Sequence, residues 1–393
     1  MSLDIEKLRS ETPGVANRVH LNNAGAGLMP RPVLDAMVGH LTREAEIGGY
    51  EAASEAAADL EGVYDSVARL LGSGRDEIAL TENATVAWQL AFYSQTFRPG
   101  DRILTARAEY AANYVAFLQM AKRTGAMIEV IPDDGNGVLD QDALDRMIDD
   151  RVRLIAITWI PTNGGLRNPA AAVGRIARKH GVRYLLDACQ AVGQMPTRLE
   201  ELGCDFLTAT GRKFLRGPRG TGFLYVRRDL MLGLEPPMID HFGAPWVAPD
   251  RYELRRDARR FETWENNYAA RLGLGRAIEY ALNLGLGKIE ERCRTLSAQL
   301  RDGLRTIPGV TVQDLGQNPA SIVTFSIKDH DAESVRATLS HSGFNVSVSY
   351  PSSTLLDAQA RHLPALIRAS PHYYNTEDEV CRFIAAMSKA VDA

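Results

Sequence analysis

The sequence predicts an α/β protein, with a large domain built on a mostly parallel sheet and a smaller α+β domain at the carboxyl end. Between residues 102 and 187, short apolar segments such as 127–132 and 152–160 alternate with amphipathic segments of helical period. This alternation, with short connections, is typical of a parallel sheet covered by helices on both faces. After residue 321 the expected order changes to strand, helix, strand, strand and helix, which indicates a separate α+β unit.

Length and composition are those of an ordinary globular enzyme. At 393 residues the chain exceeds what one hydrophobic core usually serves, so two domains are expected. The hydrophobic fraction of 45%, the charged fraction of 24% and the formal net charge of -4 indicate neither nucleic acid nor a membrane as a partner. The apolar run 154–160 is much shorter than the roughly 20 residues that a membrane-spanning helix needs.

The first residues and the cysteines indicate a cytoplasmic protein. Residues 1–15 are mixed in charge and lack the apolar stretch of a secretory signal. The four cysteines, Cys189, Cys204, Cys293 and Cys381, have no spacing typical of a metal site and are too few for a disulfide framework. A reducing compartment is therefore expected.

The regions on either side of the alternating segment are predicted to be mainly helical. The pattern predicts a loop of small residues at 22–27 and one continuous amphipathic helix over 52–71. A further helix begins near Ala84, where free backbone N–H groups suit a phosphate, although Thr85 in its first turn could equally be a plain helix cap. Residues 227–260 are expected to cross the surface or meet a partner subunit. A long helix, which its glycines could bend, then follows from residue 261.

Polar residues stand at the ends of successive predicted strands. Ligands of parallel α/β sheets bind beyond the carboxyl ends of the strands, so these residues are expected to lie together. A lysine just past a buried strand, such as Lys213, can be held where its ammonium form is disfavoured, which frees the amine for Schiff-base chemistry. Pyridoxal phosphate (PLP), an aldehyde with a phosphate, fits this combination. The candidates are Thr85, Glu109 with Tyr110, Asn163, Asp187 with Gln190, and Lys213.

Seven motifs, spread over nearly the whole chain, carry a resemblance to a known family. They are HLNNAGAG, TENAT, AEYAAN, DACQAVGQMP, TGRKFLRGPRGTGFLYV, RFETWENNYA and RASPHYYNTEDEV. The chain resembles the class V aminotransferase family of fold-type I PLP enzymes, which includes cysteine desulfurases, selenocysteine lyases, isopenicillin N epimerase and C–S lyases. The resemblance implies a large PLP-binding domain with a seven-stranded type of sheet over residues 21–256 and a small α+β domain over 257–393. It also implies that segment 1–20 packs with the small domain.

Carried over residue by residue, the resemblance assigns the cofactor site. Lys213 corresponds to the Schiff-base lysine. Asp187 corresponds to the carboxylate that pairs with the pyridine nitrogen and so keeps the ring an electron sink. Gln190 resembles the glutamine that bonds the phenolic oxygen, and Asn163 the asparagine near that oxygen and the substrate carboxylate. Tyr110 stands where desulfurases have a histidine stacked on the ring; an aromatic ring can stack there, but without the proton-transfer ability of imidazole.

The resemblance also implies how the two anionic groups are held. The phosphate cradle corresponds to the Ala84 backbone, Thr85, Thr210 and Arg212. Arg212 replaces a common histidine, and a guanidinium suits a phosphate well. Arg368 resembles the arginine that binds the α-carboxylate of an amino-acid substrate.

Family members are homodimers with active sites at the subunit boundary, and residues 227–267 would contribute to that boundary here. The neighbouring subunit often adds a phosphate contact from the FETWENN segment. Glu265 stands where threonine is usual, so Asn266 or Asn267 would have to supply that contact. A substrate pocket and an exposed loop would show the same residues in this region. The candidates for the pocket are Trp246, Trp264, His241 and the basic run 255–260.

The segment before Arg368 narrows the reaction. Desulfurases that store sulfur as a persulfide carry a cysteine on a mobile loop there, because a thiolate must attack the substrate sulfur. Residues 346–366 contain none, and the four cysteines resemble structural ones. We therefore expect β-elimination from cysteine or a cysteine derivative, a C–S lyase reaction. Arg368 and Asn163 would hold the substrate carboxylate, and Lys213 would act as general base.

The same residues would serve two other reactions. An amino-acid epimerase or racemase would need a second acid, for which Tyr350, His241 and His372 are candidates. An aminotransferase would return the proton to the cofactor instead. A regulatory protein that has kept the cofactor fold is disfavoured, because Asp187 and Lys213 are both present and no DNA-binding region is attached.

Overall fold

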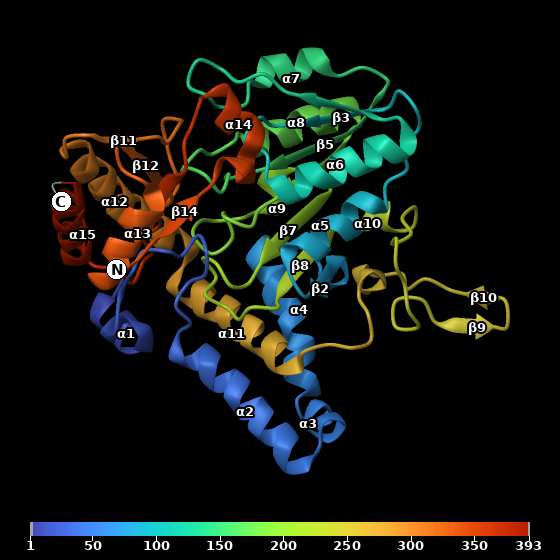
Figure 1. Ribbon diagram of the computed structural model, residues 1–393. Coiled ribbons are helices and arrows are strands. Elements are labelled where there is room, and N and C mark those ends of the chain that lie inside the picture. Colours follow the sequence, from blue (N-terminus) through green and yellow to red (C-terminus); the bar gives the residue numbers. More distant parts are fainter. Residues whose placement is uncertain (1–2, 392–393) are drawn as a thin grey trace.

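A seven-stranded sheet forms the centre of the protein in the computed structural model, which describes residues 3–391 (Figure 1). Its strand order is β2-β8-β7-β6-β5-β3-β4, and all neighbouring pairs are parallel except those of β8, which runs antiparallel to β2 and β7. This mostly parallel sheet confirms the predicted α/β class. The strands are β2 (Ile78–Thr81), β3 (Arg102–Thr105), β4 (Met127–Val130), β5 (Val152–Thr158), β6 (Arg183–Asp187), β7 (Phe206–Thr210) and β8 (Gly222–Val226).

Helices cover both faces of this sheet, which is why its central strands are continuously apolar. Along β5, Ile155 and Ile157 belong to the core under helices α4, α8 and α11, whereas Leu154 and Ala156 belong to the core under α5 and α6. The period of two along a strand sends neighbouring side chains to opposite layers. The helices of this body are α4 (Ala57–Leu71), α5 (Ala84–Tyr93), α6 (Ala111–Thr124), α7 (Gln141–Met147), α8 (Ala170–His180), α9 (Leu199–Leu202), α10 (Arg228–Met231) and α11 (Tyr268–Leu284).

Two expected helices are divided in the structure, one of them at a glycine, where a bend was expected. The helix expected over 52–71 is divided into α3 (Gly49–Glu55) and α4 at Ala56, where small and polar side chains bury too little surface to hold one axis. The long helix after residue 261 is divided into α11 and α12 (Leu286–Arg305) at Gly285, whose φ of +87° is a conformation that favours glycine. The helix α2 (Arg31–Ile47) packs on α11.

A second, antiparallel sheet, of order β11-β12-β15-β14, lies in the carboxyl-terminal part. Leu300, Phe325 and Phe383 are in the core between this sheet and its helices. Its strands are β11 (Val310–Val312), β12 (Val323–Ile327), β14 (Ser347–Ser349) and β15 (Leu366–Ala369), and its remaining helices are α13 (Ala332–His341), α14 (Leu355–Ala360) and α15 (Glu377–Val391).

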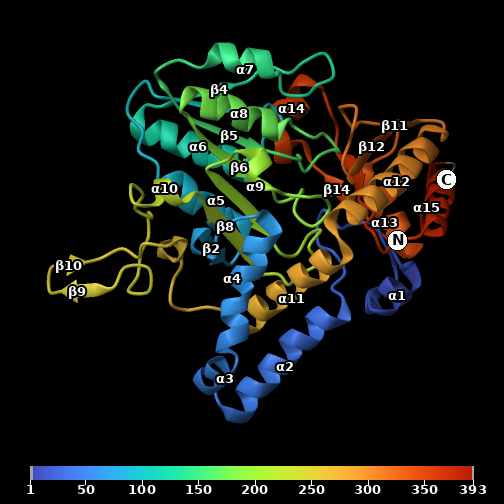
Figure 2. The same cartoon turned by 180° about the vertical axis from the view of Figure 1, so that it is seen from behind.

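The first residues are joined to this carboxyl-terminal part. Strand β1 (Val19–His20) pairs in parallel with β13 (Phe344–Asn345), and Arg9 of helix α1 (Ile5–Ser10) forms a 2.8 Å ion pair with Glu379. Both ends of the chain accordingly lie on the same side of the molecule in the two views (Figures 1 and 2).

One hairpin projects from the body. Strands β9 (Trp246–Ala248) and β10 (Arg251–Tyr252) extend away from the sheet in both views, and Trp246 is 75% exposed (Figures 1 and 2). Within residues 3–391, no helix combines the length and the apolar character needed to cross a membrane.

Candidate active site

A pocket lies at the carboxyl ends of the parallel strands, the position expected for the ligand of such a sheet. Strand β6 ends at Asp187, and the register pairs Asp187 with Thr158, the last residue of β5. Lys213 follows the end of β7 by three residues. Six of the ten expected site residues line this pocket, namely Ala84, Thr85, Tyr110, Asp187, Gln190 and Lys213, together with Asn113, Thr158, Ile160, Thr162 and Cys189.

Asp187 is buried at the end of β6 and is oriented by two donors. Its Oδ2 accepts a hydrogen bond of 3.0 Å from Asn113 Nδ2, and its Oδ1 accepts one of 2.9 Å from the backbone N–H of Cys189. No ion pair to Asp187 exists within residues 3–391. A buried carboxylate without a cation is suited to receive the protonated nitrogen of a ligand.

Lys213 is partly buried, and its ammonium has no hydrogen-bond or ion-pair partner in the described part of the chain. Burial lowers the pKa of the Lys213 amine, and the positive charges of Arg212 and Arg368 act in the same direction, whereas Cys189 and Asp187 oppose them. A lowered pKa raises the fraction of neutral amine, the form that is a nucleophile and a base.

The N-terminus of α5 presents free donors to the same pocket. Asn83 caps the helix by accepting a 3.0 Å hydrogen bond from the N–H of Val86, while the N–H groups of Ala84 and Thr85 have no acceptor among residues 3–391. Strand β8 packs closely against this turn, because a Cβ at Gly222 would lie 3.0 Å from the Ala84 nitrogen. The free N–H groups of this turn are thus available to a ligand in the pocket, and the packing of β8 holds the turn in place. Both features suit a phosphate site.

Thr210 and Arg212 lie beside this pocket but do not line it. The Thr210 hydroxyl donates to the backbone oxygen of Thr221 at 3.1 Å, and the Arg212 guanidinium donates to the backbone oxygen of Gly25. Both side chains are thus bonded to the protein backbone. Burial lowers the pKa of Arg212, and the charge of Arg219 adds to that effect, so an anion nearby would be favourable.

Arg368 of β15 reaches the pocket through Thr162. Its guanidinium donates to Thr162 Oγ1 at 2.7 Å and to Ser347 Oγ at 3.1 Å, it is only 8% exposed, and no carboxylate pairs with it within the described residues. Burial lowers the pKa of Arg368 to about 10, and Arg212 contributes in the same direction. This buried cation without an internal counter-ion is suited to a substrate carboxylate.

Asn163 faces the carboxyl-terminal part rather than the pocket. Its Nδ2 donates to the backbone oxygen of Tyr350 and to Thr354 Oγ1, both at 3.0 Å, and its Oδ1 is buried without a partner among residues 3–391. Asn163 therefore ties the loop after β5 to the segment before β15.

Comparison with known proteins places the chain in a family. The family described as "Aminotransferase class-V" matches residues 19–383. The chain belongs to the class V aminotransferase family. A "Probable cysteine desulfurase" of Xylella fastidiosa (strain 9a5c) is 33% identical over 404 residues, which cover 99% of this chain and 96% of that protein. The cofactor of the family is PLP, as the resemblance implied.

Solved structures confirm fold type I. The apo structure of the cysteine desulfurase from Thermococcus onnurineus NA1 has a TM-score of 0.93 and 26% identity, and covers 100% of this chain and 99% of that one. The cystine C–S lyase C-DES, solved with its reaction product cysteine persulfide, has a TM-score of 0.85 and 22% identity, and covers 96% of this chain and 99% of that one. At that identity the second likeness concerns the fold alone.

One further observation shows that the pocket of this class V aminotransferase suits PLP. Gln190 lines the pocket, and its Nε2 donates to the backbone oxygen of Ala24 at 3.2 Å, while its Oε1 is buried without a partner in the described chain. A buried polar atom without a partner is costly, and a polar ligand in the pocket can satisfy it. Together, the polar groups of this pocket match those of PLP. They are the free N–H groups of the helix, a lysine without a partner, an aspartate without a cation and this amide oxygen.

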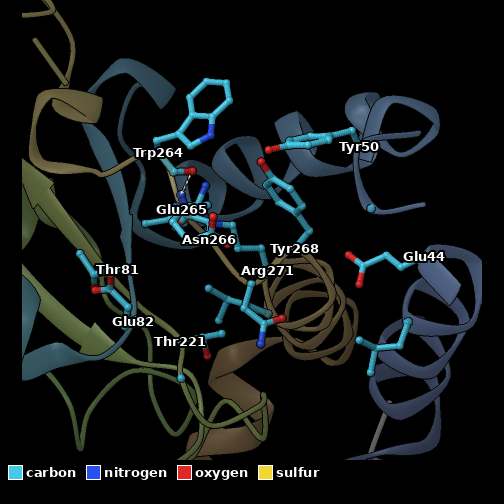
Figure 3. Close-up of a pocket in the computed structure, with 17 residues that line it drawn as sticks. Glu44, Tyr50, Thr81, Glu82, Thr221, Trp264, Glu265, Asn266, Tyr268 and Arg271 are labelled. Carbon is cyan, nitrogen blue, oxygen red and sulfur yellow. Dashed lines mark hydrogen bonds between the residues drawn. The ribbon is translucent and has the colours of Figure 1, made fainter. Parts of the chain in front are cut away.

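The FETWENN segment lines a second, open pocket, and Lys213 is not among the residues that line it. Figure 3 shows Trp264, Glu265 and Asn266 facing Tyr50 across this pocket, with Arg271 below them. Arg271 donates to Asn266 Oδ1 at 2.5 Å and to Glu262 at 2.9 Å. Asn267 caps α11 by accepting a 2.9 Å hydrogen bond from the N–H of Ala270. The Asn266 and Asn267 side-chain oxygens are thus already bonded within this chain.

The three candidates for a second acid do not line the Lys213 pocket. His372 is buried and contacts the Phe214 backbone oxygen at 2.7 Å. Tyr350 is 47% exposed and its hydroxyl donates to Glu333, and the His241 ring lies 5.3 Å from that of Trp264. Trp246, Trp264 and the basic run 255–260 also lie outside the lining of that pocket.

The sequence patterns did not assign Asn113, Thr158 and Thr162, which line the pocket. A signal existed for Asn113, because it follows Tyr110, the N-cap of α6, by three residues and so lies in the first turn of the helix that starts at that candidate. Thr162 directly precedes Asn163, but contact with Arg368 across 206 positions could not be inferred from spacing.

Proposed function

We propose that this class V aminotransferase is a PLP-dependent C–S lyase acting on L-cysteine or a cysteine derivative. The observation that carries the proposal is the buried Arg368 without a counter-ion, next to a pocket that holds an unpaired lysine of lowered pKa and a buried aspartate. An α-amino acid fits both ends of this site, because its carboxylate complements the arginine and its amine can replace the lysine. The name cysteine desulfurase among its relatives supports a sulfur-containing substrate.

The residues of the pocket would hold the cofactor by its two ends. Asp187 would pair with the pyridine nitrogen, while the N–H groups of Ala84 and Thr85 would bind the phosphate. When bound, PLP supplies an electron sink for negative charge at the substrate α-carbon. Tyr110 at the start of α6 lines the pocket and offers a flat ring for stacking.

Lys213 and Arg368 would then do the protein's part of the chemistry. Arg368 would bind the substrate carboxylate, and Thr162 would keep the guanidinium oriented through its hydroxyl, 2.7 Å away. The Lys213 amine, made less basic by burial, would take the α-proton and return protons to the products. Elimination from cysteine consumes one water and yields pyruvate, ammonia and hydrogen sulfide.

Sulfur would leave without a persulfide on the segment before Arg368. Residues 346–366 contain no cysteine, and Asn163 ties Tyr350 and Thr354 of that segment to the loop after β5. Cys189 lines the pocket, but burial and the charge of Asp187 raise the pKa of its thiol well above the usual value. A protonated thiol is a poor nucleophile, so Cys189 is not suited to accept sulfur.

Epimerisation is the second candidate. It would need an acid on the opposite side of the cofactor from Lys213, and none of Tyr350, His241 and His372 lines the pocket. Transamination would need the same residues as elimination and differs only in where the proton returns. Product analysis separates the three.

We also propose a homodimer. Leu34, Val38 and Leu41 form an exposed apolar row on one side of α2, and the projecting hairpin exposes Trp246. Large exposed apolar patches mark interfaces, and a short two-stranded hairpin has little stability on its own. Light scattering behind size exclusion should give twice the chain mass of 43.2 kDa.

The deciding experiment follows the products. Purified protein loaded with PLP is incubated with L-cysteine, L-cystine, cysteine S-conjugates and simple L- or D-amino acids, and pyruvate, sulfide and optical rotation are measured. We expect pyruvate and sulfide in equal amounts from L-cysteine. Pyruvate without sulfur release from any of these substrates would contradict the proposal, and loss of optical rotation alone would establish the epimerase.

A further inference from the structure

Glu109 is a buried carboxylate directly behind the pocket. It precedes α6, is 3% exposed, and has no ion-pair partner among residues 3–391. Five donors surround it instead. Its Oε2 accepts from the Thr158 N–H at 2.9 Å and from Thr105 Oγ1 at 3.2 Å, and its Oε1 accepts from the Tyr110 N–H at 2.8 Å, from Asn113 Nδ2 at 2.8 Å and from the Thr158 hydroxyl.

These donors come from three elements around the pocket, and Tyr110, Asn113 and Thr158 line it. Thr105 ends β3, Thr158 ends β5, and Tyr110 with Asn113 forms the first turn of α6. Glu109 therefore joins two neighbouring strand ends to the helix that carries the ring-stacking candidate. So many donors on one carboxylate are more than a structural cap requires, since a helix cap uses one or two.

Asn113 extends this network to Asp187. Its single Nδ2 donates one hydrogen to Glu109 Oε1 at 2.8 Å and the other to Asp187 Oδ2 at 3.0 Å. Both neighbours are carboxylates, so only the NH2 side of the amide can face them. The amide orientation is thus determined by Glu109, and the second hydrogen is aimed at Asp187.

We propose that Glu109 is a positioning residue for the cofactor, which acts through Asn113 to hold the Asp187 carboxylate in the orientation that binds the pyridine nitrogen. The inference rests on PLP binding in this pocket and is independent of which reaction follows. The site then contains two carboxylates bridged by one amide, with no cation paired to either in the described chain. The positive charge of a protonated pyridine would compensate this arrangement.

The test compares Glu109→Gln, Asn113→Ala and the double variant. A glutamine at 109 must turn its NH2 group toward either the Thr158 N–H or the Tyr110 N–H, so it cannot reproduce all five contacts. Asn113→Ala removes only the bridge. Each protein is stripped of PLP and titrated with PLP by absorbance and fluorescence, and its unfolding temperature is recorded.

We expect each single variant to weaken PLP binding about tenfold, the effect of one charge-assisted hydrogen bond. The double variant should also weaken it about tenfold, because residues acting through one bridge are not additive. The pH at which the visible band of the bound cofactor changes should shift equally in the two single variants, since both disturb Asp187.

Asp205→Asn is the matched control. Asp205 is another buried acid of the same sheet, bonded to the Tyr184 N–H at 2.8 Å, but it precedes β7 and so lies at the opposite edge from Lys213. This variant should lower the unfolding temperature without changing PLP affinity or the spectral pH dependence.

The outcomes separate the two proposals. If the unsubstituted protein fails to bind PLP, the proposed function is wrong. If it binds PLP and the Glu109→Gln and Asn113→Ala proteins bind it equally well, or their effects add to about a hundredfold in the double variant, the positioning role of Glu109 is wrong. If Glu109→Gln does not fold, the Asn113→Ala protein alone decides, because it leaves the other four donors in place.

Discussion

Arg301 of helix α12 and Arg368 of strand β15 are both buried, but only Arg301 has a carboxylate at its guanidinium. Arg301 forms a 2.7 Å ion pair with Asp314 and donates to the backbone oxygens of Ala320 and Ile322. Arg368 donates only to neutral oxygens, chiefly those of Thr162 and Ser347. The first charge is neutralised within the fold, whereas the second is left for an anion that the chain does not contain.

A third buried arginine shows that the lack of a carboxylate partner does not by itself indicate a ligand site. Arg216 also lacks a carboxylate partner within residues 3–391, yet its guanidinium lies 4.3 Å from the Tyr374 ring and 5.1 Å from the Tyr373 ring. Its polar atoms donate to Leu28, Thr12 and Tyr373. Aromatic faces stabilise this cation in place of an acid. No aromatic ring plays that part for Arg368 in the described chain, which strengthens its assignment to a ligand.

The largest expected effect concerns the internal pair. Arg301→Met leaves Asp314 buried without its cation, so the free energy of unfolding should fall by about 3–5 kcal/mol. Urea denaturation of the PLP-loaded protein measures this. The KM of the protein that remains folded should not change, because Arg301 is outside the pocket. A KM increase would show that the two arginines do not have separate roles.

Arg368→Met should have the opposite profile. It removes a buried charge that has no counter-ion, so stability should be equal or slightly higher, while kcat/KM for L-cysteine should fall roughly 100- to 1,000-fold. Steady-state kinetics and thermal unfolding check the two halves. Cysteamine, which has no carboxylate, serves as the control substrate, and its turnover should be the same with and without the arginine. An equal loss for both substrates would refute carboxylate binding.

A smaller effect is expected from Glu109 in the PLP-free protein. Burial raises the pKa of Glu109 from 4.5 to about 7, and the negative charge of Asp187 also raises it. The hydrogen bonds from Thr158 and Asn113 lower this pKa and so oppose the two effects. Between these values the folded protein binds the proton and the unfolded chain does not, so stability should fall as the pH rises from about 4.5 to 7, by at most about 3 kcal/mol.

The measurement is the difference between the unsubstituted and Glu109→Gln proteins in urea unfolding at each pH, which isolates this one group. Glutamine cannot titrate, so its curve should lack the fall. A difference curve that is flat over this range would mean that Glu109 is ionised throughout.

The smallest effect is expected at Cys189. The proposed elimination releases sulfur without attack by a thiol of the protein. Cys189→Ala should therefore keep the rates of pyruvate and sulfide formation within about twofold and change stability little. Cys381→Ser, a change at an exposed position, is the control. Abolished sulfide release with Cys189→Ala would show that this thiol takes part in the reaction.

Local patterns were sufficient for the fold class and for the gathering of six candidate residues at one pocket. Strand and helix periodicity predicted the parallel sheet. The position of Asp187 at the end of one strand and of Lys213 just after another placed both in one pocket. The break at Ala56 was not predicted, because the alanine-rich stretch around it has the same helical character on both sides. Thr210 and Arg212 were expected at the phosphate. Thr210 bonds to Thr221, 11 positions along the chain, whereas the bond of Arg212 to Gly25 joins residues 187 positions apart and could not be inferred from spacing.

By itself, the sequence determined which side chains follow which strands, since that depends only on neighbours along the chain. The tertiary structure alone decided how their charges are balanced. Asn113 meets Asp187 across 74 positions, and Arg368 meets Thr162 across 206. Whether a buried charge is neutralised depends on such distant contacts, because electrostatic energy follows distance in space and the local dielectric rather than separation in sequence. For this reason the sequence does not show that Arg301 has a carboxylate partner and Arg368 has none, and only the fold distinguishes them.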